Sequence, residues 1–91
     1  MKNKIALSSL AMDLKRIALG IYHNSPTTAE KFSQEAFSRI SETDLKSMAS
    51  YMKNIILKIK NDLPKPKTQQ IAENFLMYST IIQNYCLVKL K

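Results

Sequence analysis

The chain contains one glycine, Gly20, in 91 residues. β-Sheets need glycine at tight hairpins and bulges, and phosphate-binding loops use several glycines, so this scarcity argues against both. A chain of this length forms one domain and buries only about 60% of the surface that it exposes when extended. The apolar fraction of 45% and the charged fraction of 23% are typical of a folded domain. The sequence therefore predicts a small helical domain with a single thin core.

Four segments carry apolar residues at alternating spacings of three and four, which is typical of helices that bury one face. The predicted helices span about residues 4–23, 26–41, 44–62 and 68–90. A proline-containing linker, residues 63–67, separates the last two, because Pro64 and Pro66 cannot continue a helix. Connections of a few residues favour antiparallel neighbours. We therefore predict an all-α fold, an antiparallel up-down-up-down four-helix bundle that forms one domain over residues 1–91.

The first predicted helix has a second apolar stripe, formed by Ile5, Met12 and Leu19. At 100° per residue these three positions align almost opposite the predicted core seam. A helix of a small monomeric bundle has no use for two opposed apolar faces. Either the first helix is more central than its neighbours, or the stripe contacts a protein partner or a second copy. The alternative is that they are scattered surface residues. Leu76 and Leu87 raise the same question for the fourth helix. If the chain self-associates, a two-fold homodimer is the expected form.

Basic residues outnumber acidic ones by 14 to 7, which gives a formal net charge of +7. A lysine-rich edge along the third predicted helix and the linker is a candidate for contact with nucleic-acid phosphates. The edge comprises Lys46, Lys53, Lys60, Lys65 and Lys67. No exposed aromatic residues alternate with these lysines, as stacking on single strands would require. The alternative is a solvated helix flank whose lysine stems cover apolar surface.

Arg16 is followed after six intervening residues by His23. This spacing resembles the arginine–histidine motif of the HEPN ribonucleases. The resemblance implies that Arg16 would stabilise a phosphate and that His23 would act as acid or base in RNA cleavage. The alternative is structural. Arg16 then pairs with Asp13 across three positions, and His23 lies at the carbonyl end of the first helix, where a cation is favourable.

Other kinds of site find little support in the sequence. His23 and Cys86 are the only histidine and cysteine, and the carboxylates are dispersed, so we expect no metal site, no disulfide and no cofactor. The uncharged stretch 74–88 is too short to span a bilayer, and charged residues follow the apolar N-terminus too soon for a signal peptide. We expect a cytoplasmic protein without a transmembrane segment.

The leading prediction is a non-enzymatic interaction or self-associating module that uses the interaction face Ile5, Met12, Leu19, Leu76 and Leu87, with no catalytic residue. An accessory nucleic-acid binder is the main alternative. Size, charge and helix count also allow an immunity-type bundle at the inner membrane face, which is an argument from fold alone.

Overall fold

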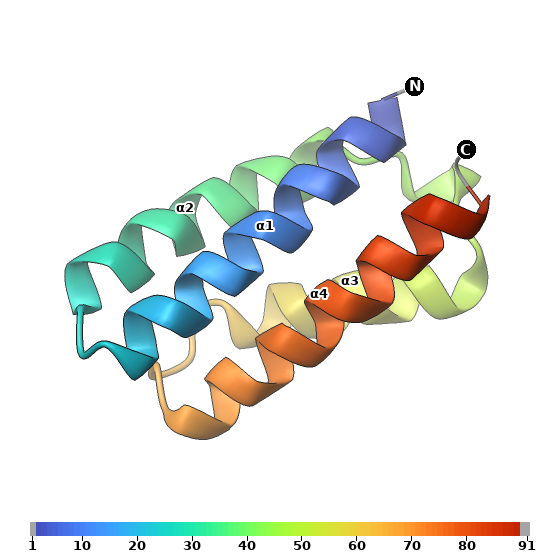
Figure 1. The fold of residues 1–91 in the computed structure, drawn as a ribbon. Coiled ribbons are helices and arrows are strands. Elements are labelled where there is room, and N and C mark those ends of the chain that lie inside the picture. The colour runs from blue at the N-terminus through green and yellow to red at the C-terminus, as the bar shows by residue number, and fades with distance from the viewer. Residues whose placement is uncertain (1, 90–91) are drawn as a thin grey trace.

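The computed structural model describes residues 2–89. Within them lie α1 (Lys2–Tyr22), α2 (Pro26–Glu42), a short 3-10 helix η1 (Leu45–Ser47), α3 (Ser50–Asp62) and α4 (Gln69–Lys89). No β-strand occurs among these residues, so the predicted all-α fold of four helices is confirmed (Figure 1). Residue 90, where the last helix was predicted to end, lies outside the described residues.

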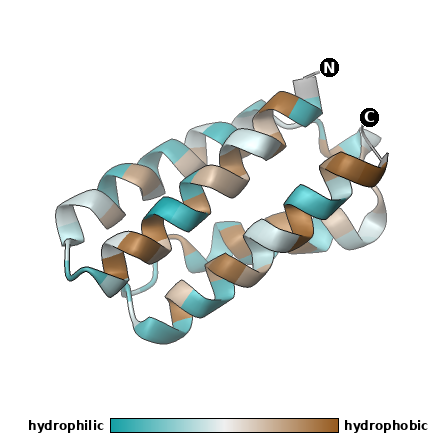
Figure 2. Cartoon of the chain, in the orientation of Figure 1, coloured by the Kyte–Doolittle hydropathy of each residue, from teal (hydrophilic) through white to brown (hydrophobic). Residues whose placement is uncertain are grey.

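α1 is the central helix of the molecule. It packs along α2 on one side and along α4 on the other, whereas the shorter α3 has fewer contacts with α4 and α2. Figure 1 shows α2 and α4 flanking α1, with the start of α1 and the end of α4 at the same end of the molecule. Hydrophobic bands recur along α1 and α4 in Figure 2. Because α2 and α4 cover two sides of α1, its remaining side faces outward and forms part of the surface of the protein.

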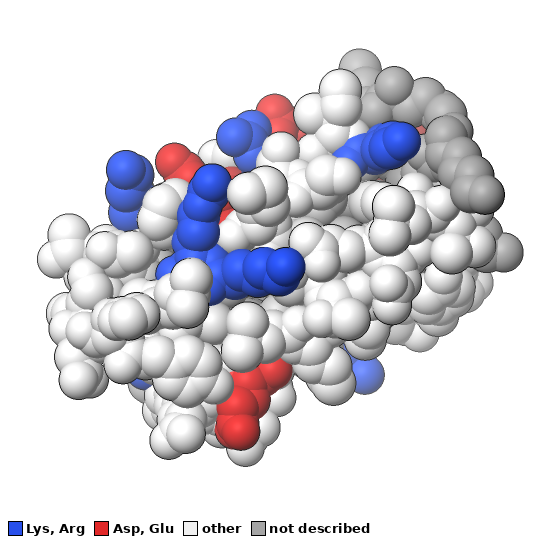
Figure 3. Space-filling view, viewed as in Figure 1, with Lys and Arg blue, Asp and Glu red and all other residues white. Residues whose placement is uncertain are grey.

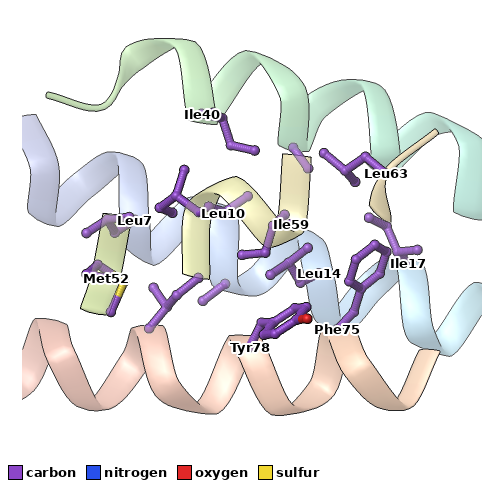
Figure 4. Close-up of a cluster of buried hydrophobic side chains, with 14 of the residues drawn as sticks. Leu7, Leu10, Leu14, Ile17, Ile40, Met52, Ile59, Leu63, Phe75 and Tyr78 are labelled. Carbon is purple, nitrogen blue, oxygen red and sulfur yellow. The ribbon is translucent and has the colours of Figure 1, made fainter. Parts of the chain in front are cut away.

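The core is one cluster to which all four helices contribute (Figure 4). Leu7, Leu14, Met52 and Phe75 are fully buried in it, as the spacing of apolar residues predicts. A buried hydroxyl joins two of the helices, because Ser79 Oγ of α4 donates a hydrogen bond of 2.9 Å to the carbonyl oxygen of Ala11 in α1. The contacts between α1 and α4 are therefore both apolar and polar.

α1 and α2 approach closely at Gly20. A Cβ atom on Gly20 would lie 3.0 Å from the backbone nitrogen of Ala29 and 3.3 Å from the carbonyl oxygen of Ser25. α2 presents other small residues on the same buried side, including Ser33 and Ala36. The single glycine thus serves close packing of two helices and not a turn.

The chain reverses between α1 and α2 through a left-handed residue, Asn24, whose φ is 53°. The Ser25 N–H donates to the carbonyl oxygen of Gly20, and the Asn24 N–H donates to that of Ile21. These two bonds form a Schellman-type end to α1. Pro26 then occupies the first position of α2, where a missing N–H costs nothing.

The predicted start of the third helix at residue 44 is wrong, because α3 begins at Ser50. Asp44 instead caps η1 by accepting hydrogen bonds from the Lys46 N–H and the Ser47 hydroxyl. The Ala49 N–H donates to the hydroxyl oxygen of Tyr85 in α4, at 3.3 Å. A contact across the bundle therefore fixes where α3 starts, and local spacing alone does not reveal it.

Candidate functional site

The outward side of α1 carries three exposed apolar side chains in one register. Ile5, Met12 and Leu19 are 70%, 49% and 53% exposed. They are seven residues apart, so they follow one line along the helix for about 21 Å at about 1.5 Å per residue. We call this line the outer face of α1. The structure thus places the predicted stripe on the surface, between the flanking helices α2 and α4.

α4 adds apolar surface beside α1. Leu87 is 69% exposed, whereas Leu76 is half-buried. Both lie within about 80° of Ser79, the residue that contacts α1, and on the same side of it. The exposed Met77 and Val88 lie farther round the helix. Figure 3 shows much of the surface over α1 and α4 as uncharged, interrupted by a group of basic side chains.

Asp13 is a buried carboxylate at the contact between α1 and α2, with only 2% of its surface exposed. It lies between the two arginines of the chain. Arg16 Nη1 is 3.5 Å from Asp13 Oδ1, and Arg39 Nε is 3.9 Å from Asp13 Oδ2. Neither Asp13 Oδ2 nor Arg39 Nε has a hydrogen-bond partner among the described residues. This cluster is therefore held by charge attraction more than by well-formed hydrogen bonds.

Burial raises the pKa of the Asp13 carboxyl above its ordinary value, and the nearby Glu35 carboxylate raises it further. The charges of Arg39 and Arg16 lower the pKa but do not offset the burial. The ionised form of Asp13 is thus less favourable in the folded protein than in water. The carboxylate holds Arg16 toward α2 at a cost in desolvation.

Arg16 and His23 line one shallow hollow between α1 and α2, with a volume of about 300 Å³. Its other lining residues include Leu19, Thr28 and Phe32. The Arg16 guanidinium carbon lies 5.2 Å from the centre of the Phe32 ring, in addition to its contact with Asp13. The predicted Asp13–Arg16 pair is therefore present. His23 is exposed and lies just beyond the end of α1, where its N–H donates to the carbonyl oxygen of Leu19.

The lysine-rich edge divides into two parts. Lys46 and Lys60 are exposed and Lys53 is half-buried. Lys65 pairs with Asp62 at 3.0 Å, and the Lys67 ammonium donates to the carbonyl oxygens of Leu63 and Lys65. The two linker lysines therefore stabilise the turn after α3, and the chain there presents fewer unpaired cations than the sequence suggests.

Metal-binding clusters and membrane-spanning helices are both absent from residues 2–89. No group of three or more histidine, cysteine, aspartate or glutamate side chains is placed to hold a metal ion. None of the helices in this range is both long and apolar enough to cross a bilayer.

The roles of Arg39 and Phe32, which complete the surroundings of Arg16, were not predicted from the sequence. Both lie in α2, on the side that borders α1. Their sequence separation of seven places them on one helix face, but only the pairing of α1 with α2 brings that face to Asp13.

Comparisons with protein-family models, with curated proteins and with solved structures found no match for this chain.

Proposed function

We propose that this protein is a small helical interaction module that self-associates through the outer face of α1. The observation that supports the proposal is the register of Ile5, Met12 and Leu19, which are exposed on a helix that already packs on two sides. Single exposed apolar residues are ordinary on a monomer. An aligned row of three, beside further apolar residues of α4, is typical of a contact surface.

The size of the row sets the strength of the association. Burial of one such side chain contributes about 1–2 kcal/mol, so six in a symmetric pair contribute roughly 6–12 kcal/mol. The loss of translational and rotational freedom opposes this by about 4 kcal/mol or more. The difference of roughly 2–8 kcal/mol predicts a weak, reversible complex, whose Kd lies between tens of millimolar and about 1 μM.

Salt dependence separates this function from nucleic-acid binding. Each copy carries a formal net charge of +7, so two copies repel each other. Added salt screens that repulsion and strengthens self-association through apolar surface. Salt has the opposite effect on a complex between lysines and phosphates, whose affinity falls steeply as salt increases.

The test is sedimentation velocity from micromolar to millimolar concentrations, at low and at high salt. Met12→Gln should lower the fraction of dimer, because it places an amide at the centre of the row. Leu57→Gln is the matched control, since Leu57 is 54% exposed but lies on α3. A wild-type protein that stays monomeric under all these conditions, or equal losses from both variants, would contradict the proposal.

A further inference from the structure

We infer that the partner of the outer face of α1 is a second copy of the same helix, antiparallel to it, with the two-fold axis beside Met12. The inference rests on the proposed function and specifies the partner and its orientation.

The spacing of the row is symmetric about its centre. Ile5 and Leu19 each lie seven residues from Met12. Consider two copies of α1 that run antiparallel, with Met12 of one copy against Met12 of the other. A residue of one copy then lies at the same height along the helix axis, or in the same layer, as the residue of the other copy for which the two numbers add to 24. Ile5 of one copy then meets Leu19 of the other at both ends of the contact. All three exposed apolar residues are covered at once, as a two-fold interface requires.

The charges flanking the row favour the antiparallel orientation. Lys15 and Arg16 adjoin Met12 and are exposed. In the antiparallel pair they lie in the layers of Ser9 and Ser8 of the second copy, whose hydroxyls accept hydrogen bonds from cations. A parallel pair would instead place Lys15 of one copy beside Arg16 of the other, at nearly the same height along the helix. Like charges placed opposite one another across an interface oppose association.

Contacts within α1 and α2 draw the Arg16 guanidinium toward α2. The guanidinium is attracted to the buried Asp13 and lies against the Phe32 ring, both on the side toward α2. The small side chains of Ser8 and Ser9 leave room on either side of Met12. A second helix that approaches the row therefore has to move only Lys15 aside, of the two cations that adjoin Met12.

An interface of standard size is a modest share of the surface of this protein. A standard stable interface buries about 800 Å² from each partner. That is about one-seventh of the 5512 Å² of accessible surface of this protein. The row of about 21 Å supplies the apolar centre of such a patch, and Leu76 and Leu87 of α4 lie at its side.

Cysteine cross-linking tests the orientation. Single cysteines replace residues of the row in a Cys86→Ala background, which removes the native buried thiol. A disulfide requires Cα atoms within about 7 Å. Met12→Cys should cross-link to its own copy under mild oxidation. Leu19→Cys alone should not, because two copies of residue 19 lie about 21 Å apart in the antiparallel pair. An equimolar mixture of Ile5→Cys and Leu19→Cys, in which Met12 is retained, should form the mixed dimer.

Leu57→Cys on α3 is the control for cross-linking by random collision, since Leu57 is exposed to a similar extent as Met12 and Leu19. Cross-linking of Met12→Cys and of the mixture at least tenfold faster than Leu57→Cys supports the inference. Rapid cross-linking of Leu19→Cys to itself, or rates equal to that of Leu57→Cys, overturns it. Sedimentation of the wild-type protein separates the two failures. If the wild-type protein is a dimer but the cross-links do not follow the antiparallel pattern, the orientation alone is refuted. If the wild-type protein is a monomer, the proposed self-association itself is refuted.

Discussion

Gly20→Ala should have two opposing effects on the free energy of unfolding, both at the contact between α1 and α2. Alanine in a helix is favoured over glycine by about 1 kcal/mol. The new methyl group, however, would lie 3.0 Å from the nitrogen and 3.3 Å from the Cα of Ala29, and 3.3 Å from the Ser25 oxygen. All three are backbone atoms at the start of α2, and they cannot move aside as a flexible side chain can. Overpacking of this kind costs typically 1–3 kcal/mol.

We expect overpacking to win, so Gly20→Ala should lower the free energy of unfolding by about 1 kcal/mol. For a domain of this size that corresponds to a fall in Tm of about 4–8 °C. The assay is thermal unfolding followed by circular dichroism. Asn84, which is exposed inside α4, provides the control. The difference in Tm between Asn84→Ala and Asn84→Gly measures the helix preference of alanine over glycine at a site where the methyl group meets no clash. If Gly20→Ala raises Tm by the same amount as that difference, the close approach of α2 does not constrain residue 20.

Three further predictions concern stability. Because the pKa of Asp13 is raised in the folded state, its contribution to stability is full below about pH 4 and is lost as the pH rises through the folded pKa. Asp13→Asn should therefore be more stable relative to the wild type at pH 7 than at pH 4 in urea titrations; the reverse order would contradict the stated cause. Tyr85→Phe leaves the Ala49 N–H without its acceptor, and we expect a loss of about 1 kcal/mol in the same assay, whereas an unchanged midpoint would show that water replaces the hydroxyl. Ser79→Ala removes the buried bond to Ala11 and should cost a similar amount, and a stabilised variant would refute that role.

The fold was largely predictable because helical spacing is a local property. Three of the helices begin and end within about two residues of the predicted positions, apart from the end at residue 90. The start of α3 was not predictable in this way. Leu45 and Met48 fit the helical spacing, but Asp44 and Tyr85 satisfy the backbone there in another form. Tyr85 is 36 positions away from the Ala49 N–H that it accepts, so local reasoning does not detect it.

The candidate surface was predictable only in part. The register of Ile5, Met12 and Leu19 follows from the sequence. The sequence left open whether other helices of the same chain cover these residues, and the structure shows them exposed. The surroundings of Asp13 were not accessible, because Arg39 reaches it only through the packing of α2 on α1. Likewise, the engagement of Lys67 with the carbonyl oxygen of Leu63 depends on how the linker turns.

The most direct test of the account is sedimentation of the full chain from micromolar to millimolar concentrations, repeated with Met12→Gln and Leu57→Gln. We predict that the wild type and Leu57→Gln shift from monomer to dimer as concentration increases, with more dimer at high salt, while Met12→Gln forms less dimer at each concentration. A wild-type protein that sediments as a monomer at every concentration and salt level would contradict the proposed role of the outer face of α1.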